Sequence, residues 1–309
     1  MENKLHVSFS PHIKSSNTTM KTMLDVIIAL VPATIAAVVL FGIPALLVIA
    51  VCVISAVAGE AIFNIAVKKE QTVGDLSAVV TGLILALNLP ANIPLWQAAV
   101  GSLFAVIIVK GLFGGLGKNI VNPAIAARVF MLIAFGSMTA SVFPKGMDSA
   151  SGATPLSDLA NDKAVDLMDL FLGKCGGALG ETCAIALLIG GVYLIVRKVI
   201  TWHIPVAFIG TTFLFTLAVE GGNLETTLAW VLSGGLMIGA FFMATDYVTS
   251  PSTAKGKLIF GIGAGVITVL IRFWGNYPEG VSFAILLMNI VNPYIDSMTQ
   301  RKIFGGVKK

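Results

Sequence analysis

Long apolar blocks separated by short polar connections dominate the pattern of this chain. A bilayer core of roughly 30 Å is crossed by about 20 residues of helix, so blocks near that length predict spanning helices. The pattern predicts an all-α integral membrane protein with about ten transmembrane helices. Five spans precede a polar stretch and five follow it, at 23–41, 44–67, 76–90, 95–112, 122–138, 177–197, 203–219, 226–245, 257–274 and 281–299.

The third and eighth spans depart from this regular pattern. Their central stretches, DLSAVVTGLILALNLP and LSGGLMIGAFFMATD, are short, contain Gly and end on Pro, Asn or Asp. Irregular backbone is tolerated at membrane depth only where it is buried in protein or lines a polar cavity. We therefore expect both spans to be broken or partly unwound around a central site.

The pentapeptide Asn-Ile-Val-Asn-Pro occurs twice, at 119–123 and 289–293, each time with the last span of a set of five. Because five is odd, a duplicated unit would enter the membrane from the opposite side, so we expect two inverted repeats. The predicted parts are an N-terminal segment, a first five-helix repeat, a loop, a second five-helix repeat and a tail, at 1–22, 23–138, 139–176, 177–300 and 301–309.

Composition and charge agree with a membrane protein and give it an orientation. The chain is 56% hydrophobic and 12% charged, with a mean hydropathy of +0.92, outside the usual range of soluble domains. Fifteen of its twenty Lys and Arg, Lys110 among them, fall in connections on the side of the N-terminus. The positive-inside rule then places both termini in the cytoplasm and the 139–176 loop on the outer face of the cell membrane. This bias accounts for the net charge of +4 without a nucleic-acid partner.

Polar residues within the predicted spans are few. Glu60 lies in the second span, where a carboxylate costs several kcal/mol unless it is paired, hydrated or protonated. It either serves an ion path or makes a structural hydrogen bond. Four acids near predicted span ends are interpreted as solvated caps: Asp25, Glu181, Asp246 and Asp296. The asparagines of the repeated pentapeptide are helix caps or amide contacts for a buried heterocycle, with caps favoured: Asn119, Asn122, Asn289 and Asn292.

Cysteine and histidine spacing indicates no metal centre and no disulfide framework. Cys52, Cys175 and Cys183 are interpreted as packing residues.

The loop 139–176 contains the one motif with a specific chemical meaning, Asp-x-x-Ser-Gly-Ala-Thr at 148–154. Alone, Thr154 before Pro155 suits a turn that caps the next segment. The full pattern, however, should arise in a chain of this length only about once in a thousand. It resembles the sequence at which a flavin transferase attaches FMN, through its phosphate, to a threonine hydroxyl. Thr154 would supply that oxygen, Gly152 and Ala153 keep the backbone accessible, and Asp148 and Ser151 complete the motif.

With this motif and ten spans, the chain resembles the family that includes the D subunits of Rnf electron-transport complexes and the B subunits of sodium-pumping NADH:quinone oxidoreductases. SPHIKSSNTTMKTMLDVIIALVPA at 10–33, GGLGKNIVNPAIAARVF at 114–130 and MNIVNPYID at 288–296 carry the resemblance further. A length near 300 and the lack of a long N-terminal extension favour the Rnf branch. The resemblance implies a urea-transporter-like pair of inverted five-helix repeats. It also implies covalent FMN on Thr154, electron relay between ferredoxin and NAD centres, and coupled Na⁺ or H⁺ translocation.

The same resemblance implies further partners and contacts. Other members of the complex would carry the ferredoxin and NAD chemistry, a flavin transferase would mature the chain, and membrane lipid would surround it. Non-covalent riboflavin would bind within the helices, with Asn119 and Asn122 as candidate contacts, and Glu60 becomes a candidate for the ion path. The main alternative is a passive transporter or channel for a small polar solute, and a membrane scaffold is a third option. Neither alternative explains the attachment motif.

Overall fold

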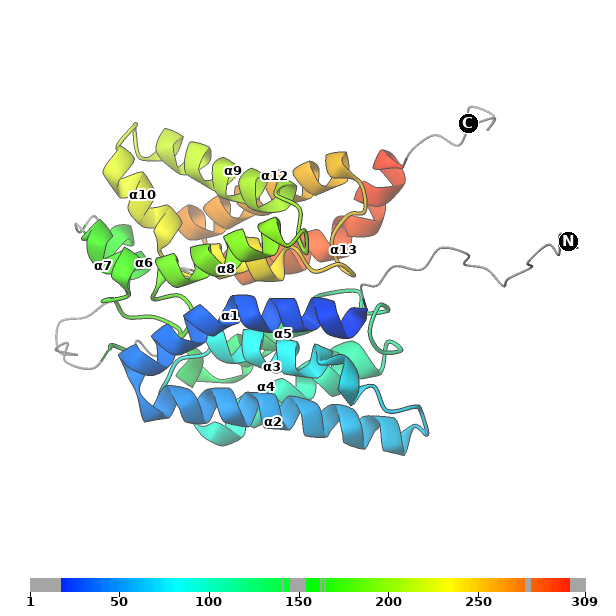
Figure 1. The fold of residues 1–309 in the computed structure, drawn as a ribbon. Coiled ribbons are helices and arrows are strands. Elements are labelled where there is room, and N and C mark those ends of the chain that lie inside the picture. Colours follow the sequence, from blue (N-terminus) through cyan, green and yellow to red (C-terminus); the bar gives the residue numbers. More distant parts are fainter. Residues whose placement is uncertain are drawn as a thin grey trace, which may run out of the picture.

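The computed structural model describes residues 18–139, 142–144, 154–161, 163, 165–275 and 279–300, and within these it is helical without a strand. Each of the ten predicted apolar blocks contains a helix (Figure 1). The first five blocks give α1 (Thr19–Phe41), α2 (Ile43–Ala66), α3 (Ser77–Leu87), α4 (Leu95–Leu103) continued by the π-helix η2 (Phe104–Gly111), and α5 (Pro123–Ala134).

The last five blocks give a similar series after two short helices. They form α8 (Ala184–Val196), α9 (His203–Val219), α10 (Leu224–Leu232) followed by α11 (Leu236–Ile238) and the π-helix η5 (Gly239–Met243), α12 (Ala254–Trp274) and α13 (Val281–Thr299). The short helices α6 (Pro155–Ala160) and α7 (Leu167–Leu172) lie between the two sets, and 3-10 turns occur at η1 (Val73–Asp75) and η3 (Gly136–Thr139).

Helix length separates clear membrane spans from shorter apolar helices. Within the part of the chain that the structure describes, four helices, α1, α2, α12 and α13, are long and apolar enough to cross a bilayer. The pair formed by α10 and the α11–η5 segment adds a fifth if it is one span. The other apolar helices have between 10 and 17 residues. The expectation of an all-helical, multi-pass membrane protein therefore agrees with the structure at this level.

The predicted break in the eighth span is confirmed. Its two parts, Leu224–Leu232 and Leu236–Met243, meet at an angle of 65°, and Gly234 at the break has a φ of +66°, in the left-handed region that favours glycine. The fourth span holds a feature that was not predicted. It changes from α-helix to π-helix at Phe104, a change that frequently marks functional sites.

The third span is a short helix whose exit is buried and hydrogen-bonded. After α3 ends at Leu87, the N–H of Gly180 donates to the Leu87 carbonyl at 2.6 Å and the N–H of Leu179 to the Leu89 carbonyl at 3.0 Å. Both donors lie in the connection before α8. The irregular backbone is thus satisfied by protein, as membrane depth requires.

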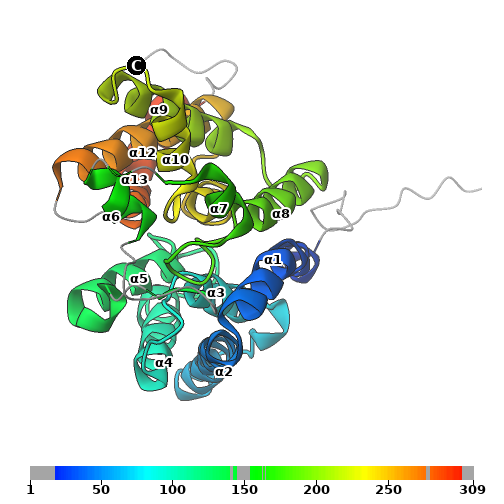
Figure 2. The same cartoon turned by 90° about the vertical axis from the view of Figure 1, so that its left-hand side faces the viewer.

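The helices form two halves with a seam between them. Figure 1 shows α1 to α5 in one half and α8 to α13 in the other, and Figure 2 shows the same division from the side. Across the seam α1 packs against α8, and α5 packs against α13. Within the halves α2 packs against α4 as α9 does against α12, and α4 packs against α5 as α12 does against α13. Helices of the same order in each set therefore make equivalent contacts.

Small residues allow the helices to approach closely. A Cβ atom added to Gly190 of α8 would lie 2.1 Å from the carbonyl oxygen of Ala29 in α1. A Cβ on Gly261 of α12 would lie 3.0 Å from the carbonyl oxygen of Ile204 in α9. Membrane helices commonly pack through such small residues, because lipid gives apolar side chains little reason to associate. The seam and the interior of the second half both use this contact.

Candidate functional site

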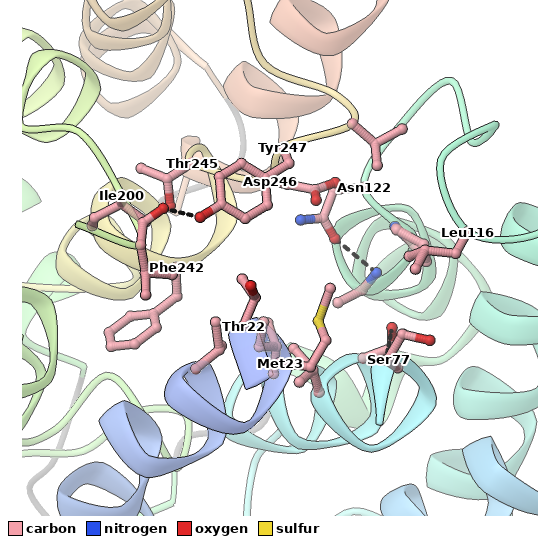
Figure 3. A pocket seen from close by; sticks show the side chains of 18 of the residues that line it. Thr22, Met23, Ser77, Leu116, Asn122, Ile200, Phe242, Thr245, Asp246 and Tyr247 are labelled. Atoms are coloured by element: carbon pink, nitrogen blue, oxygen red, sulfur yellow. Dashed lines mark hydrogen bonds between the residues drawn. The ribbon is translucent and has the colours of Figure 1, made fainter. Parts of the chain in front are cut away.

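A cavity of about 780 Å³ lies at the seam and is lined by both halves. Figure 3 shows side chains entering it from α1, α3 and the start of α5 on one side, and from η5 and the residues after it on the other. Its polar and aromatic lining includes Ser77, Lys110, Asn119, Asn122, Phe241, Phe242, Asp246 and Tyr247. Concave sites with a largely apolar lining and a few polar groups commonly hold small organic ligands and cofactors.

The two copies of the repeated pentapeptide meet beside this cavity. The Asn122 side-chain oxygen accepts from the N–H of Ala124 at 3.0 Å and so caps α5. Its Nδ2 donates across the seam to the carbonyl of Met243 at 3.1 Å. With its amide oriented to satisfy both neighbours, Asn289 accepts from the Asn122 N–H at 3.1 Å and donates to the Thr249 carbonyl at 3.2 Å. The repeat therefore joins the halves, and the cap favoured for Asn122 is confirmed.

Asn119, the other predicted flavin contact, also lines the cavity. Its Nδ2 donates to the Val121 carbonyl at 3.0 Å, so it braces the turn before α5 instead of capping the helix. Asn292, in the second copy, lies inside α13 with its Oδ1 buried and without a hydrogen-bond partner among the described residues. The four asparagines thus have different roles, although two of them border the same cavity.

Aromatic side chains give the cavity its flat apolar surfaces. Phe241 and Phe242 enter from η5, and Tyr247 follows with its hydroxyl donating to the Val199 carbonyl. Asp246 supplies a carboxylate whose Oδ2 accepts from the Thr249 hydroxyl at 3.0 Å. Apolar faces combined with a few fixed polar groups suit a flat heterocycle with polar edges. Sequence reasoning missed these aromatics, although the run Phe-Phe-Met-Ala-Thr-Asp at the end of the broken span was the available signal.

Glu60 forms a buried ion pair that the sequence did not reveal. Its Oε1 accepts from Lys110 Nζ at 2.8 Å and from the Thr72 hydroxyl at 2.7 Å. Lys110 also donates to Ser77 Oγ at 2.6 Å. Lys110 was counted among the cytoplasmic-loop cations, which is wrong, because it lies in η2 with 3% of its surface exposed. The buried charge is tolerated because Glu60 neutralises it.

Lys110 separates two cavities. It lines the seam cavity together with Ser77, and it lines a second cavity, of about 800 Å³, together with Glu60 and Thr72. The Glu60 Oε2 atom is buried and has no hydrogen-bond partner among the described residues. Glu60 is therefore neither a fully satisfied structural group nor a free charge, and both interpretations of it stay open.

A second buried charge cluster lies at the other end of the seam. The Arg128 guanidinium donates to Asn88 at the end of α3, to Glu181 at 2.7 Å and to Glu279 before α13. Glu181 was predicted to be a solvated cap, which is wrong, because it is buried and its charge is met by Arg128. The cluster connects α5 of the first half with two connections of the second.

Arg272 secures the break in the eighth span. Its guanidinium donates to the carbonyl of Trp230 at 2.6 Å and to that of Ser233 at 3.0 Å, where α10 ends. The last carbonyls of a helix lack intrahelical partners, so a buried arginine can replace water there. No role was assigned to Arg128 or Arg272 from the sequence, because the acceptors that each guanidinium binds lie far from it along the chain.

Two further acids that were predicted to be caps have other roles. Asp296 was predicted to be a solvated cap, but it lies inside α13 and accepts from the N–H and the hydroxyl of Ser252, both at 3.0 Å, so it joins α13 to the connection before α12. Asp25 lies inside α1 and accepts from the Tyr193 hydroxyl at 2.9 Å, so it is a helix-to-helix contact and not a cap.

The three cysteines are free thiols. Burial and the nearby Glu181 and Asp169 carboxylates raise the pKa of Cys175 to about 12.

Thr154 is the member of the attachment motif that the structure describes. It is half-buried and forms the N-cap of α6, where its hydroxyl oxygen accepts from the Ser157 N–H at 3.4 Å. The capping geometry considered for Thr154 is thus present. Asp148, Ser151, Gly152 and Ala153 lie outside the described residues. In Figure 1, α6 lies at the opposite end of the molecule from the start of α1 and the end of α13.

Comparison with known proteins agrees with these features. The model of the NQR2, RnfD, RnfE family matches residues 6–305. The D subunit of the Na⁺-translocating ferredoxin:NAD⁺ oxidoreductase complex of Acetobacterium woodii is 48% identical over 313 residues, covering 99% of this chain and 97% of that protein. Its proton-translocating counterpart in Clostridium ljungdahlii is 42% identical, covering 98% and 97%. The D subunit of the ion-translocating oxidoreductase complex of Ectopseudomonas mendocina is 37% identical, covering 97% and 95%.

These matches confirm the resemblance that the attachment motif and the three sequence stretches indicated. They extend along nearly the whole chain, as that resemblance did. The chain therefore belongs to the NQR2, RnfD, RnfE family, among the D subunits of ion-translocating oxidoreductase complexes.

Proposed function

We propose that this chain carries FMN covalently on Thr154 and relays electrons between ferredoxin and NAD redox centres of a membrane complex that translocates Na⁺ or H⁺. The observation that carries the proposal is the Asp-x-x-Ser-Gly-Ala-Thr motif at 148–154 in a chain of this family. Relatives named as members of such complexes support partners of the Rnf type. Maturation then requires a flavin transferase, and catalysis requires the other chains of the complex.

Thr154 fits the group it would hold. Thr154 is half-buried at the start of α6, and a phosphoester formed there keeps the oxygen that accepts from the Ser157 N–H. Modification is therefore compatible with the cap. Once bound, FMN would supply the chemistry that no side chain offers at this position, the acceptance and release of one or two electrons. Pro155 at the first helical position fixes the backbone direction behind the threonine.

The seam cavity fits a second, non-covalent flavin, which we propose is riboflavin. Asn119 and Asn122 present amides at one side, and Phe241 and Phe242 present aromatic surface at another. Because this flavin lacks a phosphate, a cavity whose surface is largely apolar, and whose Lys110 ammonium is already paired with Glu60, suits it. The residues of this chain would orient the heterocycle and exclude water from it.

We also propose that the ten apolar segments cross the membrane as two inverted five-helix repeats. Equivalent helix contacts within the halves support this, as do the contacts of α1 with α8 and of α5 with α13 across the seam. The start of α1 and the end of α13 lie at one end of the molecule, and α6 and α7 lie at the other (Figure 1). With the charge bias of the connections, this arrangement favours cytoplasmic termini and an outer flavin loop in the cell membrane.

Glu60 and Lys110 are the proposed ion-path residues of this chain. They join a cavity bordered by Glu70 and Lys69 to the seam cavity. A buried carboxylate with one oxygen left without a partner is a suitable transient ligand for a cation or a proton.

In-gel ultraviolet fluorescence of the denatured chain, co-expressed with a flavin transferase, tests the covalent flavin. We expect a fluorescent band in the wild type and a dark band in Thr154→Ala, because alanine lacks the oxygen that forms the phosphoester. Ser157→Ala is the matched control, since it removes a nearby hydroxyl while keeping the N–H that Thr154 binds. A dark wild-type band beside a lit flavoprotein standard would refute the proposal and favour the passive solute transporter.

A further inference from the structure

A groove of about 760 Å³ lies where α1 begins and α8 ends. It is separate from the flavin motif, which lies at the other end of the molecule (Figure 1). Three cationic side chains line it and only one carboxylate does, so its charge is positive. The charged lining residues are Lys21, Asp25, Arg197 and Lys198, and Tyr247 borders them.

The cations are held in place by the ends of the two helices. Arg197 contacts the Asp25 carboxylate at 3.3 and 3.4 Å, which ties the end of α8 to the first turns of α1. Lys198 follows in a left-handed conformation with a φ of +58°. Backbone hydrogen bonds close this turn, from Lys198 to the Ile195 carbonyl at 3.0 Å and from Val199 to the Leu194 carbonyl at 2.9 Å. The turn places Lys198 at the groove.

Two exposed apolar stripes lead away from the groove along the same two helices. On α1 the stripe consists of Leu24, Ile28, Val31, Ile35 and Val39, and on α8 it consists of Val196, Val192, Ile189 and Ile185. Their exposed fractions range from 39% to 72%. The spacing of three or four residues puts each stripe on one helix face. The two helices that carry the stripes pack against each other and run side by side at the edge of the seam (Figures 1 and 2).

We propose that this groove binds the headgroup of an anionic phospholipid whose acyl chains lie on the two stripes. The cations match the phosphate, since basic pockets between membrane helices commonly hold such headgroups. The stripes match the hydrocarbon, which distinguishes a lipid from a free anion. In the proposed topology the site faces the cytoplasmic leaflet, where anionic lipids generate a negative surface potential.

The bound lipid would stabilise the seam. It contacts α1 from the first half and α8 from the second, which pack together there. Tyr247 lines both this groove and the seam cavity. A headgroup bound in the groove would therefore lie next to the seam cavity, with Tyr247 between them. The inference does not depend on a flavin at either proposed position, and a failure of the flavin test would leave it unchanged.

Native mass spectrometry of the full chain in detergent tests the site. The chain is titrated with phosphatidylglycerol or phosphatidylcholine carrying identical acyl chains, and the bound fraction is measured. We expect wild type to prefer phosphatidylglycerol and Lys198→Gln to lose about fivefold of that preference, the factor expected for one interfacial cation. Lys255→Gln is the control, because it removes an exposed cation at the start of α12, outside the groove, and should leave the preference unchanged.

Three results would overturn the proposal. Equal binding of the two lipids would show that the groove does not select an anionic headgroup. An equal loss of preference in Lys255→Gln would indicate a general charge effect. Displacement of phosphatidylglycerol by millimolar inorganic phosphate, with phosphate binding that also depends on Lys198, would identify a plain anion site. Ile189→Asn separates lipid from free phosphate further, since a polar residue on the α8 stripe should weaken lipid binding and leave phosphate binding unaffected.

Discussion

Lys110 and Glu60 form a buried pair, so changing either residue alone leaves one charge in the protein interior. Glu60→Gln should therefore destabilise the chain by about 3–5 kcal/mol, because the Lys110 ammonium stays buried without an opposite charge. The double variant Glu60→Gln, Lys110→Gln removes both charges and should recover most of that loss. Thermal unfolding in detergent measures the difference.

Ion uptake by vesicles that contain the assembled complex then isolates the functional role. If Glu60 serves the ion path, the stable double variant takes up little Na⁺ or H⁺ although it folds. Unchanged uptake in that variant would remove Glu60 from the path. Loss of uptake in Glu60→Gln but not in the double variant would show only that the unpaired Lys110 charge damages the fold.

Glu279 gives the Arg128 cluster a pH dependence. Partial burial, which leaves 32% of its side chain exposed, raises the pKa of Glu279 from 4.5 to about 7; Arg128 opposes the shift and Glu181 adds to it. A carboxyl with a higher pKa in the folded state binds its proton more tightly there, so its stabilising effect is complete below about pH 4.5 and disappears as the pH rises through 7. The side chain of glutamine does not titrate, so Glu279→Gln lacks this pH dependence. We expect the melting temperature of wild type relative to Glu279→Gln to fall between pH 4.5 and 7, and a constant difference would contradict the shift.

The sequence did not reveal how the buried charged residues pair with one another. Glu60 and Lys110 are 50 positions apart, and Arg128 and Glu181 are 53 apart. Hydropathy identifies such residues as costly, but it does not say which opposite charge meets them. Lys110 and Glu181 were therefore assigned to solvent, whereas the capping role of Asn122 was predictable. That cap depends only on local position at the start of a helix.

At the scale of elements, the break between α10 and α11 lies against both α6 and Arg272. Gly234 has a φ of +66°, and a Cβ there would lie 2.6 Å from Leu156 of α6 and 3.2 Å from Arg272. Gly234→Ala should therefore destabilise the chain by about 1–3 kcal/mol through backbone strain and the displaced contacts. Thermal unfolding in detergent measures the loss.

Gly210→Ala is the control for this prediction. Gly210 lies inside α9, where an added Cβ meets no atom within 4 Å. Alanine there should raise stability by about 0.4–1 kcal/mol, because glycine loses more backbone entropy on folding. Equal effects of the two substitutions would mean that the break tolerates a side chain. Retained covalent flavin in Gly234→Ala would show that α6 keeps its position without this contact.

The elements themselves were largely predictable from the sequence. Ten apolar blocks gave ten helical segments, because a run of apolar residues of near-membrane length has few other stable structures in lipid. The glycines and terminal polar residues predicted the break in the eighth span. The π-helical segments η2 and η5 were not predictable, since the same apolar residues suit an α-helix equally well.

At the scale of the whole molecule, the seam is the product of both halves and neither half contains it alone. Asn122 comes from the first half and contacts Met243 and Asn289 of the second. The repeated pentapeptide indicated that two copies of one unit exist, but it did not indicate that they touch. For the same reason Phe241 and Phe242 were not connected with Asn119 and Asn122 before the structure placed them around one cavity.

Filling the seam cavity should remove the proposed riboflavin and leave the proposed covalent FMN on Thr154 in place. Val26 of α1 lines the cavity, and Val26→Phe adds volume where the heterocycle would lie. We expect this variant to lose most of the riboflavin that acid denaturation releases from wild type, while in-gel fluorescence at Thr154 stays unchanged. Overpacking costs about 1–3 kcal/mol, which the fold should tolerate. Ile28→Phe, which adds the same ring on the exposed side of α1, should release riboflavin normally. Unchanged riboflavin in a folded Val26→Phe protein would place the second flavin elsewhere, because two bulky groups cannot share one cavity.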